Sequence, residues 1–151
     1  MRLFNLEEYA NLTRPQLDWI VHKLIPTPGL VMLIGPPKEG KSFLALQLAL
    51  AVARGDDWMG QKTEAGKVWY LQLDASEVSW RDRLKSLKAH GEDLSGDVMM
   101  VHPDDQPPLD ILDLSTQAWV REILRAFSPR LVIIDVLREL HGLNEDKSAD
   151  M

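Results

Sequence analysis

The sequence has no cysteine among its 151 residues, which excludes a disulfide framework and a cysteine-based zinc site. Its apolar runs stop short of the roughly 20 residues that cross a bilayer, and the first residues, MRLFNLEEYANLTR, include acids and no long apolar core. We therefore expect neither a membrane partner nor a signal peptide. These absences are compatible with a cytoplasmic protein.

Basic residues are also few. The 17 Lys and Arg are outnumbered by 23 Asp and Glu, giving a net charge of −6, and no run of Lys or Arg occurs. A nucleic-acid-binding surface usually shows as a basic cluster, so contact with DNA is expected only through regions beyond residue 151. The four histidines are too scattered to predict a metal cluster. Hydrophobic and charged contents of 45% and 26% are typical of a soluble globular protein of single-domain size.

One motif stands out against this background. Residues 35–42, GPPKEGKS, match the P-loop pattern G-x-x-x-x-G-K-[ST]. The short apolar run 30–34, LVMLI, predicts a buried strand before the loop, and the almost wholly apolar stretch 42–53 predicts a buried helix after it. The predicted order of strand, glycine-rich loop and helix is the context that the P-loop requires.

Each part of this motif has a chemical purpose. Glycines allow the backbone N–H groups to turn toward phosphate oxygens, and the helix directs its positive dipole end at the same anion. Lys41 would supply a positive charge to the β- and γ-phosphates of ATP, and the Ser42 hydroxyl would ligate Mg²⁺. The predicted nucleotide-binding residues are Gly35, Pro36, Pro37, Lys38, Glu39, Gly40, Lys41, Ser42 and Phe43.

A second acidic motif supports the magnesium site. Asp135 follows four apolar residues in LVIID, residues 131–135, which reads as a strand with an acid at its carboxyl end. That is the Walker B position, where a carboxylate holds Mg²⁺. Taken alone, Asp135 could equally be a strand-end residue that caps the next turn. Paired with the P-loop, it is predicted to share Mg²⁺ with Ser42.

The order of elements narrows the class of nucleotide-binding protein. Two further strands, 68–73 and 98–101, alternate with helical stripes around Trp80 and from Ser115 onward, which predicts an α/β fold with a mostly parallel sheet flanked by helices. GTPases would show D-x-x-G after the second acid, but Val136, Leu137 and Arg138 follow Asp135. The guanine motif N-K-x-D and the Arg-rich lid of nucleotide kinases are also missing from the sequence.

Four segments resemble the RecA-like ATPases of the plasmid RepA replicative-helicase type, which are related to DnaB. They are GPPKEGKSFLALQLALAVA, GKVWYLQLD, RDRLKSL and LVIIDVLRELHGLNEDKSADM. The resemblance implies a RecA-like P-loop fold, ATP and Mg²⁺ as cofactors, ATP hydrolysis, and a homo-oligomer, a hexamer, when full length. Its most distinctive part follows the second acid, where these residues fall in comparable places: Asp135, Leu137, Arg138, His141, Asn144, Glu145 and Ser148.

The resemblance also implies catalytic roles. Lys41 and Asp135 match the family pattern, but Asp74 stands where the family usually has the Glu that activates the attacking water. Asp74 is therefore the candidate base, and Glu77 is an alternative. Asp74 could instead be only a helix N-cap, in a capping box with Glu77. Arg138 or His141 could sense the γ-phosphate or a neighbouring subunit, or be structural.

A complete RecA-like core continues beyond the Walker B strand, so we expect that this chain is truncated after it. Residues 1–28 are expected to be a lead-in segment and residues 29–151 the incomplete ATP-binding core. Two other functions stay open: a RecA- or KaiC-like ATPase without unwinding activity, and a non-catalytic nucleotide-binding or assembly module.

Overall fold

The computed structural model describes residues 3–12, 17–101 and 109–137. Within these ranges, no helix combines the length and the apolar character needed to cross a membrane. The elements in chain order are α1 (Leu6–Ala10), β1 (Asp18–Val21), β2 (Ile25–Thr27), α2 (Lys41–Arg54), β3 (Val68–Gln72), α3 (Glu77–Ala89), β4 (Val98–Val101), α4 (Leu114–Phe127) and β5 (Leu131–Asp135).

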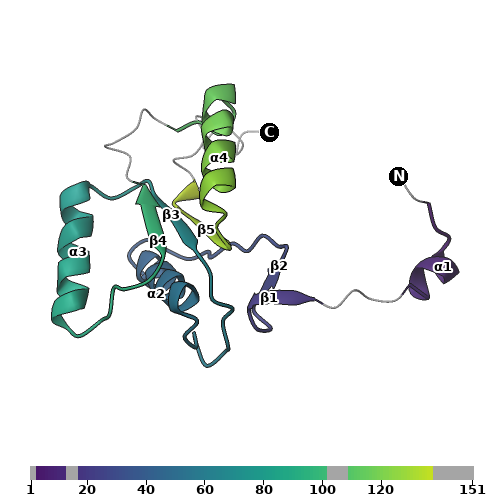
Figure 1. Cartoon of the computed structure of the whole chain (residues 1–151), viewed down its shortest axis with the longest axis horizontal. Helices are drawn as coiled ribbons and strands as arrows, with labels where there is room; N and C mark the ends of the chain where they lie inside the picture. The colour runs from purple at the N-terminus through teal and green to yellow at the C-terminus, as the bar shows by residue number, and fades with distance from the viewer. Residues whose placement is uncertain (1–2, 13–16, 102–108, 138–151) are drawn as a thin grey trace.

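A parallel sheet of three strands, in the order β4-β3-β5, forms the centre of the molecule (Figure 1). All five residues of the middle strand β3 are buried, as expected for a strand with neighbours on both edges and helices on both faces. These three strands are the ones predicted at 68–73, 98–101 and 131–135. The predicted α/β class, with parallel strands and crossover helices, is confirmed.

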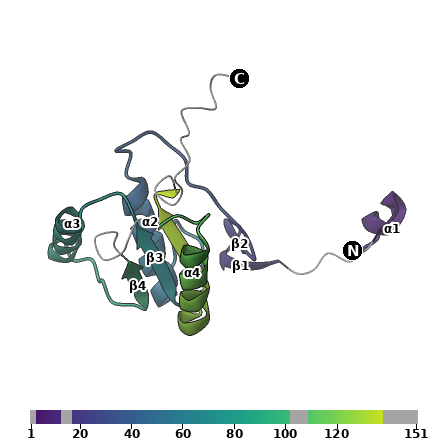
Figure 2. The same ribbon diagram turned by 90° about the horizontal axis from the view of Figure 1, so that it is seen from above.

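Helices cover both faces of this sheet (Figure 2). On one face, α2 and Trp80 of α3 pack against Val68 and Tyr70. On the other face, Trp69 and Leu71 contact α4, and the rings of Trp69 and Trp119 meet edge to face at 5.6 Å. The period-two alternation of β3 therefore supplies one set of side chains to each of two apolar clusters.

The segment before the P-loop, part of the predicted lead-in, contains an antiparallel hairpin, β1–β2. Its Ile20, Val21 and Ile25 are buried in the same apolar cluster as α2. The hairpin thus packs beside the P-loop helix, while the division of the chain at residue 28 stays a prediction.

The prediction of a buried strand at 30–34 is wrong. These residues form no strand in the structure, and their side chains are exposed, from 53% for Val31 and Leu33 to 91% for Leu30. An apolar run becomes a strand only where a neighbouring strand takes its backbone hydrogen bonds, and among the described residues no strand does so for this run. Composition alone could not reveal that missing partner.

Candidate functional site

The loop that carries the P-loop motif is exposed and leads directly into α2. Gly40, the N-cap residue of α2, has a φ of 79°, a left-handed conformation that glycine adopts without steric cost. As glycine has no side chain, no side-chain hydrogen bond caps this end of the helix. The first-turn N–H groups of α2 are therefore suited to bind an anion, with the helix dipole reinforcing the attraction.

Lys41 reaches back across the loop. Its Nζ donates to the carbonyl oxygen of Gly35 at 2.8 Å and to that of Pro36 at 2.6 Å. These two bonds bring the ammonium group to the start of the loop, six residues back along the chain. The Lys41 ammonium group and the amino end of α2 thus both lie at the loop of residues 35–40.

Asp135, the acid predicted from the Walker B pattern, is connected to the first turn of α2 by the hydroxyl of Tyr70. Asp135 ends β5 and is the register partner of Gln72, which places it on the sheet face that α2 covers. The hydroxyl of Tyr70 donates to Asp135 Oδ2 at 2.8 Å and lies 3.5 Å from the carbonyl oxygen of Ser42. One tyrosine hydroxyl therefore lies between the two residues that were predicted to hold Mg²⁺.

Tyr70 was not singled out from the sequence. It is fully buried, and burial, followed by the nearby Asp135 carboxylate, raises the pKa of the Tyr70 hydroxyl far above its ordinary value, so the group stays protonated as a donor. A usable signal did exist. A tyrosine in the middle of a buried strand must find a polar partner for its hydroxyl, and Asp135 is the acid at the tip of another predicted strand.

Asp74 lies two residues beyond the end of β3, at the carboxyl end of the parallel sheet, where Asp135 also lies. The N–H of Leu73 donates to the carbonyl oxygen of Asp135 at 2.6 Å, so Asp74 is one residue away from a direct link to the tip of β5. Its side chain is exposed. The sheet thus brings Asp74 and Asp135 to neighbouring strand ends.

The prediction that Asp74 could be the N-cap of the next helix is wrong. Helix α3 begins at Glu77, its N-cap is Ser76, and the Ser76 hydroxyl accepts from the N–H of Ser79. Two residues between Asp74 and the helix put the aspartate outside the cap position. The predicted partner of that capping box, Glu77, instead forms an ion pair with Arg81 one turn further on.

The oxygen atoms of Ser42 and Asp135 are compatible with a magnesium ion that also binds the phosphate groups of a nucleotide. Ser42 and Asp135 offer hydroxyl and carboxylate oxygens, the hard donors that Mg²⁺ prefers. In the part of the chain that the structure describes, no group of three or more His, Asp or Glu could hold a metal by itself. Mg²⁺ usually takes one or two protein oxygens and completes its shell with water and phosphate, so this sparse set fits.

The other predicted site residues lie on the loop and the first turn of α2. Pro37, Lys38 and Glu39 are exposed, and Phe43 is 40% exposed. Arg138 and His141, the predicted sensors, lie outside the described residues.

A family model described as an AAA domain matches residues 3–151. The chain belongs to this family. AAA domains are nucleotide-binding, ATPase-like domains that generally use ATP with Mg²⁺ and often oligomerise. The match thus agrees with the P-loop reading of residues 35–42 and with the α/β fold.

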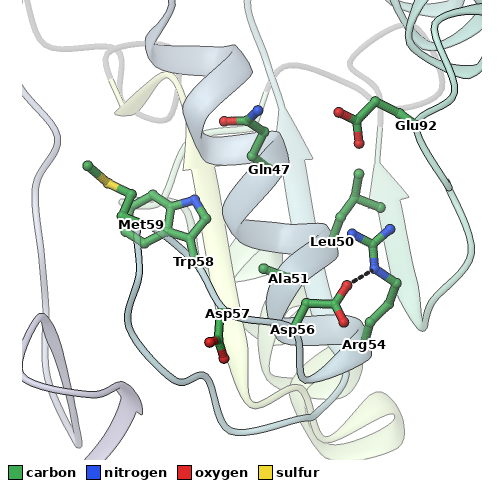
Figure 3. A pocket seen from close by; sticks show the side chains of 9 residues that line it. All are labelled: Gln47, Leu50, Ala51, Arg54, Asp56, Asp57, Trp58, Met59 and Glu92. Carbon is green, nitrogen blue, oxygen red and sulfur yellow. Dashed lines mark hydrogen bonds and ion pairs between the residues drawn. The ribbon is translucent and has the colours of Figure 1, made fainter.

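This AAA domain also has a hollow at the opposite end of α2, with a volume of about 290 Å³ (Figure 3). Three acids line it, and its Arg54 is already paired with Asp56 at 2.6 Å. The carboxyl end of a helix carries partial negative charge, so this hollow is electrostatically unsuited to a triphosphate. None of the predicted site residues lines this hollow. Its lining consists of Gln47, Leu50, Ala51, Arg54, Asp56, Asp57, Trp58, Met59 and Glu92.

Proposed function

We propose that this AAA domain binds ATP with Mg²⁺ at residues 35–43 and hydrolyses the ATP, as the motor core of a DNA helicase of the RepA/DnaB type or of a related DNA-replication ATPase. The observation that supports binding most directly is the convergence of the amino end of α2 and the Walker B acid, bridged by the Tyr70 hydroxyl. The helicase assignment is supported by the resemblance of the segment after Asp135.

Each side chain has a defined task in this proposal. Lys41 exchanges its carbonyl partners for phosphate oxygens, to which an ammonium group binds more strongly because both groups are charged. The Ser42 hydroxyl and the Asp135 carboxylate are the protein ligands for Mg²⁺, which would neutralise phosphate charge when bound. Asp74, at the neighbouring strand end, accepts a proton from the water that attacks the γ-phosphate.

The binding step is tested with Lys41→Ala. Removing one partner of a charge pair that excludes water typically costs several kcal/mol, so ATP affinity measured by calorimetry should fall by about a hundredfold or more. Circular dichroism should show an unchanged fold, because Lys41 is only partly buried.

Lys62→Ala is the matched control for that experiment. Lys62 is exposed and pairs with Asp57, just past the carboxyl end of α2, so its loss should leave ATP affinity unchanged. If folded Lys41→Ala bound ATP as tightly as the wild type, the P-loop assignment would be refuted.

Two assays on the gene product separate the helicase proposal from its alternatives. Helicase activity predicts both ATP turnover and displacement of a labelled strand from a forked duplex. Turnover without displacement would favour a RecA- or KaiC-like ATPase. ATP binding without turnover would favour a non-catalytic nucleotide-binding or assembly module.

A further inference from the structure

We propose that Tyr70 is a positioning residue for Mg²⁺ binding: its hydroxyl, which lies between the tip of β5 and the first turn of α2, fixes the orientation of the Asp135 carboxylate. The inference rests on the proposed function, because it concerns the same site. Neither the P-loop motif nor the Walker B pattern includes this residue.

The Tyr70 ring is held rigidly. The residue is fully buried in the middle of β3, and its ring packs against that of Trp80 with 5.7 Å between centroids. Trp80 is itself buried, and its Nε1 donates to Met100 Sδ at 3.3 Å on the neighbouring strand β4. Packing from α3 and β4 thus leaves the Tyr70 hydroxyl as a fixed point inside the site.

The fixed hydroxyl restricts the carboxylate. Asp135 is the last residue of its strand, where a side chain without a partner could rotate. The 2.8 Å bond from Tyr70 to Oδ2 removes that freedom and leaves the second oxygen, Oδ1, to serve as the metal ligand. Hydrogen bonds to the outer oxygen of a ligating carboxylate are a common means of orienting it, and their loss weakens metal binding.

The same hydroxyl also touches the helix that carries Ser42. Its oxygen lies 3.5 Å from the Ser42 carbonyl oxygen, compared with 2.8 Å to Asp135, so its single proton goes to the carboxylate. The hydroxyl thus holds the Asp135 carboxylate beside the first turn of α2, which carries Ser42, the other predicted ligand of Mg²⁺.

The decisive variant is Tyr70→Phe, which keeps the ring and removes only the hydroxyl. ATP affinity is measured while Mg²⁺ is titrated, and again in EDTA. The Mg²⁺ concentration that gives half of the maximal gain in ATP affinity, the Mg²⁺ midpoint, should rise by about tenfold. This is the lower end of the range for residues that orient metal ligands. Affinity in EDTA should stay the same, because the contacts of the loop with phosphate are intact.

Trp69→Phe serves as the matched control. Trp69 is the buried neighbour of Tyr70 on β3, but its ring packs against Trp119 on the opposite face of the sheet, so the change lowers the melting temperature and keeps both the packing of the Tyr70 ring and its hydroxyl bond to Asp135. A structural role for Tyr70 predicts that both variants respond alike. A positioning role predicts a shifted Mg²⁺ midpoint only in Tyr70→Phe.

A wild-type measurement covers the case in which Tyr70→Phe fails to fold. The chain has two tyrosines, Tyr9 and Tyr70, so protein labelled with 3-fluorotyrosine gives two ¹⁹F resonances, assigned with Tyr9→Phe. Addition of Mg²⁺ to the ATP complex should move the Tyr70 resonance and leave that of Tyr9 in place.

The outcomes separate this inference from the proposed function. Wild-type protein that does not bind ATP would overturn both. Wild-type protein that binds ATP, with the same Mg²⁺ midpoint in folded Tyr70→Phe or with a Tyr70 resonance that does not respond to Mg²⁺, would overturn the role of Tyr70 alone.

Discussion

At the scale of single residues, the turn after β3 assigns the capping of α3 to Ser76, although Asp74 was a candidate both for that cap and for the catalytic base. Asp74 lies next to Leu73, whose N–H is bonded to the carbonyl oxygen of Asp135. Because Ser76, not Asp74, is the N-cap of α3, replacing Asp74 does not remove the N-cap of the helix. The proposed role of Asp74 as the base can therefore be tested in variants of this residue.

We expect Asp74→Asn to lower the rate of ATP turnover by at least about a hundredfold, the lower end of a general-base contribution, with ATP affinity nearly unchanged. Asp74→Glu, which restores the residue usual in RepA-type ATPases, should keep or raise the rate. Steady-state phosphate release measures both. Full activity in Asp74→Asn would contradict the assignment.

Glu77→Gln is the control for this series. Glu77 already pairs with Arg81 on the surface of α3, so its replacement should leave the turnover rate unchanged. A large loss of turnover in Glu77→Gln, together with full activity in Asp74→Asn, would move the base to Glu77.

At the scale of elements, the start of α4 is sensitive to pH. The side chain of its N-cap, Asp113, accepts from the N–H of Thr116 and from the hydroxyl of Ser115. The Ser115 hydrogen bond, followed by that of the Thr116 backbone, lowers the pKa of Asp113 below its ordinary value of 3.8. Stabilisation by this cap is therefore complete above that value and is lost as the pH falls through the lowered pKa.

Asp113→Ala should accordingly lower the melting temperature at pH 7 by about 2–4 °C, the effect of losing one helix cap in a chain of this size. The difference from the wild type should shrink as the pH falls below 3.8 toward the lowered pKa, because the wild-type cap then becomes protonated too. Thermal unfolding monitored by circular dichroism measures it. A difference that is constant down to pH 2 would contradict the capping role.

The elements also show how far sequence reasoning reached. Apolar runs predicted β3, β4 and β5, and the helical stripe from Ser115 onward predicted α4. These patterns report burial directly. They could not identify which apolar run has a partner strand, so 30–34 was wrongly assigned.

Within the candidate site too, the sequence could not show contacts that depend on strand pairing. The motifs located Lys41, Ser42 and Asp135 because each position is defined by its spacing along the chain. Tyr70 escaped because its role depends on register: the β3–β5 pairing aligns Tyr70 with Ile133 and brings its hydroxyl to Asp135. No local pattern contains that information.

At the scale of the whole molecule, the two edges of the sheet differ. All four residues of β4 are half-buried and pack into the two apolar clusters. On β5, Val132 and Ile134 are each 38% exposed, and neither belongs to a cluster formed by the residues that the structure describes. An exposed apolar edge strand is a site at which a second chain can pair.

We therefore expect concentration-dependent self-association of the chain, and we expect Val132→Lys to reduce it, because a lysine on each of two pairing strands adds like-charge repulsion. The free energy of unfolding should change by no more than about 0.5 kcal/mol, as is usual for a partly exposed position. Sedimentation velocity at several concentrations measures the association.

Ile133→Lys is the contrasting variant. Ile133 packs into the cluster below α2, so a charge there should prevent folding instead of preventing association. Equal association of folded Val132→Lys and wild type would exclude the β5 edge as the contact.

The symmetry of such a contact has a consequence for assembly. Two identical β5 edges can pair equivalently only about a twofold axis, with the strands antiparallel, and this gives a closed dimer with a six-stranded sheet. The carboxyl ends of the two sets of strands, where Asp74 and Asp135 lie, would then point in opposite directions. A ring requires a head-to-tail contact between two different surfaces. The hexamer that the resemblance to RepA-type ATPases implies would need such a contact, so pairing through β5 would compete with it for protomers.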